Sequence, residues 1–308
     1  MNTEMNLDRK IKYVCIVDSV LLVILVAGLL CAPGNRARRG TMKNLITLDS
    51  ITHITLSGGT SMEILKQGET WQYIRNGAEL PVNAGRVDAF IKSIQKPAKI
   101  TPVGRTQDAL QTYKLTEQER IVVELANNNN KQSFYLSPLM DSADTCYVMF
   151  NGNNTVYKAE TSSASFLLGM TRDWLDLKLL SNVSVKDVQR FTIKGKLTKE
   201  NIEGAFARST NGWIYENNTE FATARVEGWL YSMVSATADD YLETLTLSNQ
   251  NETVLISLEL GNGTTKHIRI YEVENSKNYI VYSSDKLYPM QCSLYQLENI
   301  LKTADELK

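Results

Sequence analysis

The chain has 308 residues, of which 43% are hydrophobic and 22% are charged, and its formal net charge is −1. These proportions are ordinary for a globular protein, so collagen-like, disordered and polytopic membrane classes are excluded for most of its length. The 33 Lys and Arg are matched by 34 Asp and Glu. This balance indicates no nucleic-acid partner, because phosphate binding needs a clustered positive field.

The first element in chain order is an apolar segment from Tyr13 to Ala32. About 20 apolar residues cross a hydrocarbon core of about 30 Å, so the segment predicts one transmembrane helix between a tail at 1–12 and a linker at 33–44. A cleaved signal peptide is the alternative, because basic residues precede the apolar run. No small-x-small cleavage site ends the run, and the residue before Cys31 is not the small one of a lipoprotein signal, so we favour an uncleaved anchor.

The orientation of this span follows only weakly from charge, because basic residues flank it on both sides. The very short tail favours an N-terminus inside, which places residues 44–308 outside the cytoplasm. Asp18 lies within the span, where a carboxylate costs on the order of 3 kcal/mol on insertion scales. Asp18 either lies near the interface, protonated or locally hydrated, or docks the span against a polytopic membrane partner.

An internal duplication organises the rest of the chain into units at 45–178 and 179–308. The strand pattern of residues 51–56 returns at 188–193, and a segment that begins at Trp71 returns at Trp213. In each copy, apolar residues at helical spacing then predict the core stripe of a helix: Val87, Phe90, Ile91 and Ile94 in the first, and Val226, Trp229, Leu230, Met233 and Val234 in the second.

The second halves of the two copies also correspond. Asparagine and glycine at 127–130 and at 261–263 indicate hairpin turns. The pair Tyr147-Val148 aligns with Tyr279-Ile280, and helical segments follow at 162–168 and 293–301. Each copy is thus expected to contain two strands, a helix, four strands and a helix. The predicted class is α+β, with two tandem repeats of a mainly antiparallel sheet and packed helices.

The chain resembles the bacterial domain-of-unknown-function family DUF4340 over residues 45–308. The residues that carry the resemblance are Asp49-Ser50-Ile51, Trp71, Pro81, Arg86-Val87-Asp88, Tyr147-Val148, Val156-Tyr157, and Leu167-Leu168 through Arg172-Asp173 to Leu179-Leu180. Tyr113-Lys114-Leu115 departs from the family pattern, because it lacks the usual glycine and proline. The resemblance implies a single-pass, extracytoplasmic protein that is often encoded beside gliding-type ABC transporter components. It supplies no catalytic residues.

Candidate catalytic and metal-binding residues are few. His53 and His267 alternate with apolar strand residues and are expected to be exposed, and neither has partners at metal-ligand spacing. The sequence contains neither a phosphate-binding G-x-x-x-x-G-K-[ST] loop nor a G-x-S-x-G elbow. We therefore expect no metal and no cofactor.

Acidic residues offer the one alternative chemistry. Asp173 and Asp176 are three residues apart, and Asp240 follows Asp239. Paired carboxylates about 5–9 Å apart can cleave glycosidic bonds. Acids at this spacing are more often helix caps or part of a solvated face, which is the interpretation we favour.

Cys146 and Cys292 are the cysteines outside the predicted span, and they occupy non-equivalent places in the two copies. In an oxidising compartment they could form a disulfide if their Cα atoms lie within about 7 Å. Otherwise they are small buried apolar residues.

These observations predict a non-enzymatic, membrane-anchored binding or scaffold subunit outside the cytoplasm. Its expected partners are a polytopic membrane protein or the components of an ABC-type transporter or related envelope assembly, with Asp18 as the docking residue. The alternative is an envelope enzyme that acts on glycan or peptide through Asp173, Asp176 or Asp240.

Overall fold

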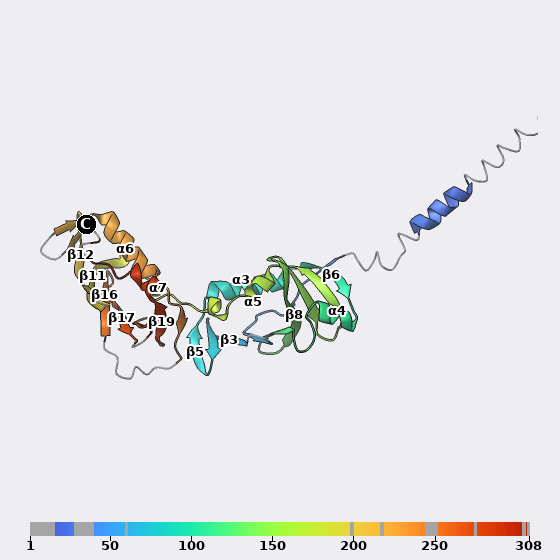
Figure 1. Cartoon of the computed structure of the whole chain (residues 1–308), viewed down its shortest axis with the longest axis horizontal. Coiled ribbons are helices and arrows are strands. Elements are labelled where there is room, and N and C mark those ends of the chain that lie inside the picture. The colour runs from blue at the N-terminus through green and yellow to red at the C-terminus, as the bar shows by residue number, and fades with distance from the viewer. Residues whose placement is uncertain are drawn as a thin grey trace, which may run out of the picture. The chain divides into compact units, whose positions relative to one another are not determined.

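The computed structural model describes residues 16–27, 40–58, 61–197, 200–215, 219–243, 252–273, 276–303 and 306. Two compact units divide the chain: residues up to 62 with 88–169, and residues 63–87 with those from 170 onward. Figure 1 shows antiparallel strands with a few helices in the body of the chain. The predicted α+β class is therefore confirmed, while the repeat boundary at 178 stays a prediction.

The first sheet has ten strands in the order β1-β6-β10-β9-β8-β7-β2-β3-β4-β5, and β1–β6, β6–β10, β10–β9, β9–β8, β8–β7, β7–β2, β3–β4 and β4–β5 are antiparallel pairs. Its strands are β1 (Thr41–Lys43), β2 (His53–Ser57), β3 (Met62–Gln67), β4 (Thr70–Arg75), β5 (Ala78–Pro81), β6 (Ala98–Gly104), β7 (Ile121–Ala126), β8 (Lys131–Ser142), β9 (Thr145–Phe150) and β10 (Val156–Glu160).

The second sheet has nine strands in the order β14-β13-β12-β11-β16-β17-β18-β19-β15. Its strands are β11 (Val188–Leu197), β12 (Glu200–Ser209), β13 (Gly212–Tyr215), β14 (Thr219–Phe221), β15 (Asp240–Tyr241), β16 (Glu252–Leu260), β17 (Thr265–Glu272), β18 (Asn278–Ser283) and β19 (Met290–Ser293).

The two sheets have the same strand order. Read from its other end, the second sheet runs β15-β19-β18-β17-β16-β11-β12-β13-β14. In the same order, these strands take the places of β6-β10-β9-β8-β7-β2-β3-β4-β5 in the first sheet. Strand β1 is the one member of the first sheet without a counterpart among the described strands. Nine strands in one order are what a duplicated unit produces, and this agrees with the internal repeat seen in the sequence.

The strand register corrects one detail of the alignment. Leu136 lies opposite Val148 in the first sheet, and Ile270 lies opposite Val281 in the second. All four side chains are buried. Val148 therefore corresponds to Val281, and the predicted pairing of Tyr147-Val148 with Tyr279-Ile280 is wrong by one residue. Because strand side chains alternate between faces, that slip would turn a core residue outward.

Each sheet packs against a helix that follows a run of four strands, β2 to β5 in the first sheet and β11 to β14 in the second. Helix α3 (Ala84–Gln95) buries Val87, Phe90 and Ile94. Helix α6 (Thr223–Ser235), which runs beside the second sheet in Figure 1, buries Val226, Trp229, Leu230 and Met233. The predicted stripes are thus confirmed at these residues, whereas Ile91 and Val234, predicted with them, are half-buried.

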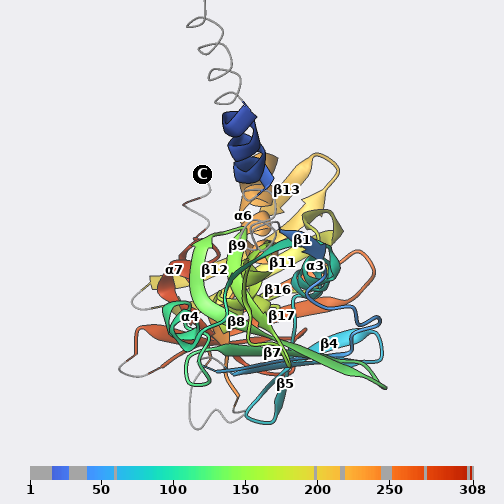
Figure 2. The same cartoon turned by 90° about the vertical axis from the view of Figure 1, so that its right-hand side faces the viewer.

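The remaining helices are short, and three of them were not predicted. They are α4 (Gln107–Thr112), α5 (Ser163–Leu167), η1 (Thr171–Trp174), η2 (Val185–Asp187) and α7 (Leu294–Glu298). Helix α4, unpredicted, lies beside the first sheet in Figures 1 and 2. The segment that follows it buries Leu115 against Met149 and Val156, with Tyr135 and Tyr147 at the margin. This small cluster lies on the sheet face opposite the main core.

The predicted membrane span is described only over residues 16–27, which form a helix. Residues 13–15 and 28–32, and with them Tyr13 and Ala32, lie outside the described residues. Within the described part of the chain, no helix combines the length and the apolar character that crossing a membrane requires. The transmembrane assignment therefore stays a prediction.

Candidate functional site

The acids that the sequence offered for chemistry lie in the second unit, and each lies beside a basic side chain. The Arg75 Nη1 atom donates to both carboxylate oxygens of Asp240, at 2.9 and 3.1 Å, and Nη2 donates to the Tyr241 carbonyl oxygen at 2.6 Å. Arg75 Nε lies 2.6 Å from a Glu243 carboxylate oxygen but makes no hydrogen bond, so this contact is an ion pair outside the N–H direction. One guanidinium thus joins two acids.

Asp176 is held in the same unit by a lysine that is almost fully buried. The Lys286 Nζ atom donates to an Asp176 carboxylate oxygen at 2.7 Å, and the Lys286 side chain is only 2% exposed. The Tyr241 hydroxyl donates to the Asp176 carbonyl oxygen at 2.7 Å. Burial and the nearby Asp176 carboxylate raise the pKa of Tyr241, so Tyr241 acts as a neutral hydrogen-bond donor at ordinary pH.

Asp173 and Asp239 have structural contacts as well. An Asp173 carboxylate oxygen lies 3.7 Å from Arg86 Nη2, and the Arg86 guanidinium lies 5.2 Å from the centroid of the Trp174 ring. Asp239 accepts a hydrogen bond from the Ser293 backbone N–H at 2.7 Å. We call the set of Arg75, Lys286, Asp176, Asp240 and Glu243 the acid–base clamp. In the clamp, carboxylates neutralise buried or half-buried cations, whereas the interpretation favoured from the sequence was helix caps or a solvated face.

Sequence reasoning found Asp176 and Asp240 of the clamp but missed Glu243 and the two basic partners, Arg75 and Lys286. Arg75 and Asp240 are 165 residues apart, and Asp176 and Lys286 are 110 apart. No local pattern links residues at such separations. The folded chain alone brings Arg75 of β4 to Asp240 of β15.

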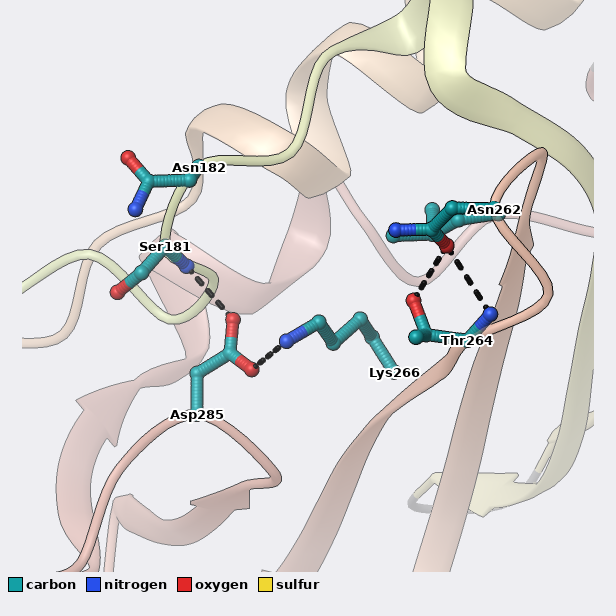
Figure 3. Close-up of a pocket in the computed structure, with 7 residues that line it drawn as sticks. Ser181, Asn182, Asn262, Thr264, Lys266 and Asp285 are labelled. Carbon is teal, nitrogen blue, oxygen red and sulfur yellow. Dashed lines mark hydrogen bonds and ion pairs between the residues drawn. The ribbon is translucent and has the colours of Figure 1, made fainter.

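A second polar feature is a hollow of about 390 Å³ at one end of the β16–β17 hairpin (Figure 3). Its lining residues are Ser181, Asn182, Leu260, Asn262, Thr264, Lys266 and Asp285. Lys266 points at Asp285, whose other carboxylate oxygen accepts the Ser181 backbone N–H at 2.9 Å. The Asp285 side chain is 5% exposed. The one cation and one anion of this lining neutralise each other, so the hollow suits neutral polar groups.

The two histidines lie on strands and are half-buried, not exposed as expected. His53 Nε2 lies 3.1 Å from the Thr55 hydroxyl, and His267 Nδ1 lies 2.9 Å from the Ser257 hydroxyl. These hydroxyl contacts occupy ring nitrogens and explain how the imidazoles tolerate partial burial. Within the described residues, no cluster of His, Cys, Asp or Glu could hold a metal ion.

Cys146 on β9 and Cys292 on β19 are both buried and carry free thiols. Burial raises the pKa of each thiol to about 12. Thiols in such surroundings are chemically inert, because the reactive species is the thiolate. The pairing of the two cysteines stays a prediction.

The outer face of the second sheet carries aromatic side chains. Tyr271 and Tyr282 meet edge to face with ring centroids 5.5 Å apart, and both are half-buried, as is Ile280. In the first sheet the equivalent face is covered by the α4 segment. The Tyr147 hydroxyl there donates to Asp141 at 2.8 Å, and burial with this contact raises the pKa of Tyr147 to about 12.

The helix of residues 16–27 presents apolar side chains outward. Its large hydrophobic residues are between 45% and 66% exposed. Such a continuous apolar surface is unfavourable in water. Asp18, the predicted docking residue, lies among these side chains and is exposed.

Comparison with known proteins supports one assignment. The family model described as "Domain of unknown function (DUF4340)" matches residues 71–269, which is more than half of the chain. Neither the curated proteins nor the solved structures contain a match. The matched range spans both the first copy from Trp71 and the second copy as far as β17. The chain therefore belongs to the DUF4340 family.

Proposed function

We propose that this chain is a non-enzymatic, membrane-anchored binding or scaffold subunit on the outer side of the cytoplasmic membrane. It would serve a polytopic partner, such as the components of an ABC-type transporter or a related envelope assembly. The observation that carries the proposal is the helix of residues 16–27, whose apolar side chains are exposed. A bilayer is the medium that covers such a helix, and the sequence extends its apolar character from Tyr13 to Ala32.

Asp18 supports the choice of a polytopic partner. An ionisable residue inside a span usually faces a partner or a polar cavity, because an unpaired carboxylate in hydrocarbon is costly. The acid–base clamp supports the non-enzymatic part of the proposal. Its carboxylates are engaged with Arg75 and Lys286, whereas a glycosidase needs acids free to exchange protons with a substrate.

Membrane attachment is tested by alkaline carbonate extraction of cell membranes. The full chain should remain in the membrane pellet, and a variant lacking residues 1–39 should be released. A full chain that appears in the carbonate supernatant would overturn the anchor. Protease treatment of intact spheroplasts should digest residues 44–308, and their protection would overturn the proposed sidedness.

The partner is tested by affinity purification from detergent-solubilised membranes. The wild-type chain should retain a polytopic protein, and Asp18→Leu should lose most of it. Val17→Leu, which changes a neighbouring apolar residue of the same helix, is the matched control and should retain the partner. Equal recovery with Asp18→Leu would remove Asp18 from the docking model, and no polytopic protein with the wild type would contradict the scaffold proposal.

A further inference from the structure

The first unit is tied close to the predicted span by strand β1. Only eight residues, 33–40, separate Ala32 from the start of β1 at Thr41. An extended chain covers at most about 3.6 Å per residue, so β1 begins within about 30 Å of the end of the span. This limit holds whatever path the linker takes.

Strand β1 is also fixed firmly to the sheet. It pairs with β6 in register, with Lys43 opposite Ala98. A Cβ added to Gly40 would lie 2.7 Å from the Thr101 hydroxyl and 2.8 Å from Lys99 Cγ. The backbone therefore approaches β6 closely just before β1, and the β1 edge is the part of the unit nearest the membrane in chain length.

Three exposed lysines lie on or beside this edge: Lys43 is on β1 itself, and Lys92 and Lys96 lie beside Ala98 of the neighbouring strand β6. Lys92 lies in the last turn of α3, Lys96 follows the end of that helix at Gln95, and both are exposed. Together with Ala98, the partner of Lys43, they line a hollow of about 400 Å³. The Lys43 Nζ atom lies 3.8 Å from the centroid of the Phe150 ring. Among the described residues, no ion pair joins these three lysines to an acid.

The acids of the region leave an excess of positive charge. Glu160 lines the same hollow, but Lys99 neutralises it at 2.9 Å. Asp88 lies one turn before Lys92 on α3 and is exposed. The linker sequence adds three arginines directly before β1, at positions 36, 38 and 39.

We propose that Lys43, Lys92 and Lys96, the lysine edge, bind the headgroups of anionic lipids. The inference rests on the proposed anchor, because the anchor holds this edge at the bilayer. Basic residues near an anionic membrane surface each strengthen attachment by about fivefold, and the attraction falls off within a Debye length. The lysine edge thereby orients the first unit against the membrane that holds it.

The test uses the full chain, with Cys15 and Cys31 changed to alanine, in vesicles of phosphatidylcholine with or without 30 mol% phosphatidylglycerol. A Thr41→Cys reporter shares one strand face with Lys43. Its reaction with a water-soluble maleimide should be about fivefold slower in the anionic vesicles at low salt. A Tyr231→Cys reporter on α6, 66% exposed, should react equally in both.

Charge variants identify the residues responsible. The triple variant K43Q/K92Q/K96Q should restore fast labelling of Thr41→Cys in anionic vesicles. The matched control K178Q/K186Q/K277Q removes three exposed lysines of the second unit and should leave labelling slow. The native thiols Cys146 and Cys292 are buried and do not contribute.

The outcomes separate this inference from the proposed function. Equal labelling of Thr41→Cys in both lipids, in a chain that resists carbonate extraction, overturns the lysine edge and leaves the anchor intact. Slow labelling that survives in K43Q/K92Q/K96Q, or is lost equally in the control variant, also overturns it. A chain that carbonate releases from the vesicles overturns the anchor itself.

Discussion

The two sheets share one strand order but differ in the side chains that fill their cores. Phe191 and Phe206 of the second copy take the register positions of Ile54 and Ile64 in the first. Trp229 of α6 aligns in sequence with Phe90 of α3. The Phe191 ring stacks on Phe206 at 4.8 Å and meets Trp229 edge to face at 5.3 Å. A duplicated fold thus tolerates aliphatic or aromatic packing, provided that the pattern of buried positions is kept.

The copies also differ on their outer faces. The α4 segment covers the outer face of the first sheet with Leu115, whereas the connection that replaces it runs from Leu242 to Asn251 and is shorter. Tyr271 and Tyr282 are half-buried on the outer face of the second sheet, as Tyr135 and Tyr147 are on that of the first.

The largest expected effect comes from the aromatic core of the second copy. Phe191→Ala should lower the free energy of unfolding by about 3–5 kcal/mol, because it removes a fully buried ring and leaves a cavity. Phe191→Ile, which installs the residue of the first copy, should cost less than half as much. Urea unfolding of the full chain in detergent, followed by tryptophan fluorescence, measures both. Equal losses would mean that ring stacking, not filled volume, holds this core.

The acid–base clamp should give the next largest effect. Lys286→Met leaves the Asp176 carboxylate without its base, and we expect a loss of about 2 kcal/mol. The value lies below the usual cost of breaking a buried pair because the Asp176 side chain is 32% exposed. Lys178→Met, at an exposed lysine of the same unit, should stay within about 0.5 kcal/mol of the wild type. A neutral Lys286→Met variant would show that the clamp adds nothing to stability.

Helix α4 can be pushed away from the first sheet by a single methyl group. An added Cβ at Gly104 would lie 2.4 Å from the Ala109 Cβ atom, so Gly104→Ala should cost about 1–3 kcal/mol through overpacking. Amide exchange at Leu115 should become faster. Gly228→Ala on α6 meets no atom within 4 Å and should stabilise the chain by about 0.5–1 kcal/mol. Unchanged exchange at Leu115 in Gly104→Ala would show that the position of α4 does not control the burial of Leu115.

The smallest effect at neutral pH comes from Cys292, whose position in the first copy is held by Ala159. Burial raises the pKa of the Cys292 thiol in the folded chain from its ordinary value of 9.0 to about 12. Unfolded thiol therefore ionises first, and the stability it contributes is complete below pH 9 and is lost as pH rises from 9 to 12. Cys292→Ala should flatten this decline relative to the wild type in urea unfolding at pH 7, 9 and 10.5. Parallel pH profiles would contradict the shielding of this thiol.

Periodicity in the sequence was sufficient for the class, the duplication and the helical stripes. Val87, Phe90 and Ile94 recur at helical spacing, and burial of an apolar stripe is a local property of such a pattern. The register of β18 could not be predicted from the sequence. Tyr279-Ile280 resembles Tyr147-Val148, but the residue equivalent to Val148 is Val281, whose side chain points to the opposite face from that of Ile280. Helix α4 was missed because its six residues include no buried one, so it has no apolar stripe to detect.

The candidate site was harder to predict than the fold. Asp173, Asp176 and Asp240 were visible as acids, but their roles depend on Arg86, Lys286 and Arg75, which approach only after folding. An ion pair between residues that are far apart in the chain cannot be recognised from a single sequence. The sequence therefore showed that acids lie close together along the chain, but not that each forms an ion pair with a distant base in the folded molecule.

Strand β1 has a further consequence for how copies of this protein coexist. An open sheet border with unpaired backbone groups can recruit strands from other molecules and start aggregation. In the first sheet β1 covers β6 at one border with three residues, and β5 ends at Pro81 at the other. The second sheet is bordered by β14 with three residues and β15 with two. Short borders of this kind favour chains that stay separate from one another at high local concentration.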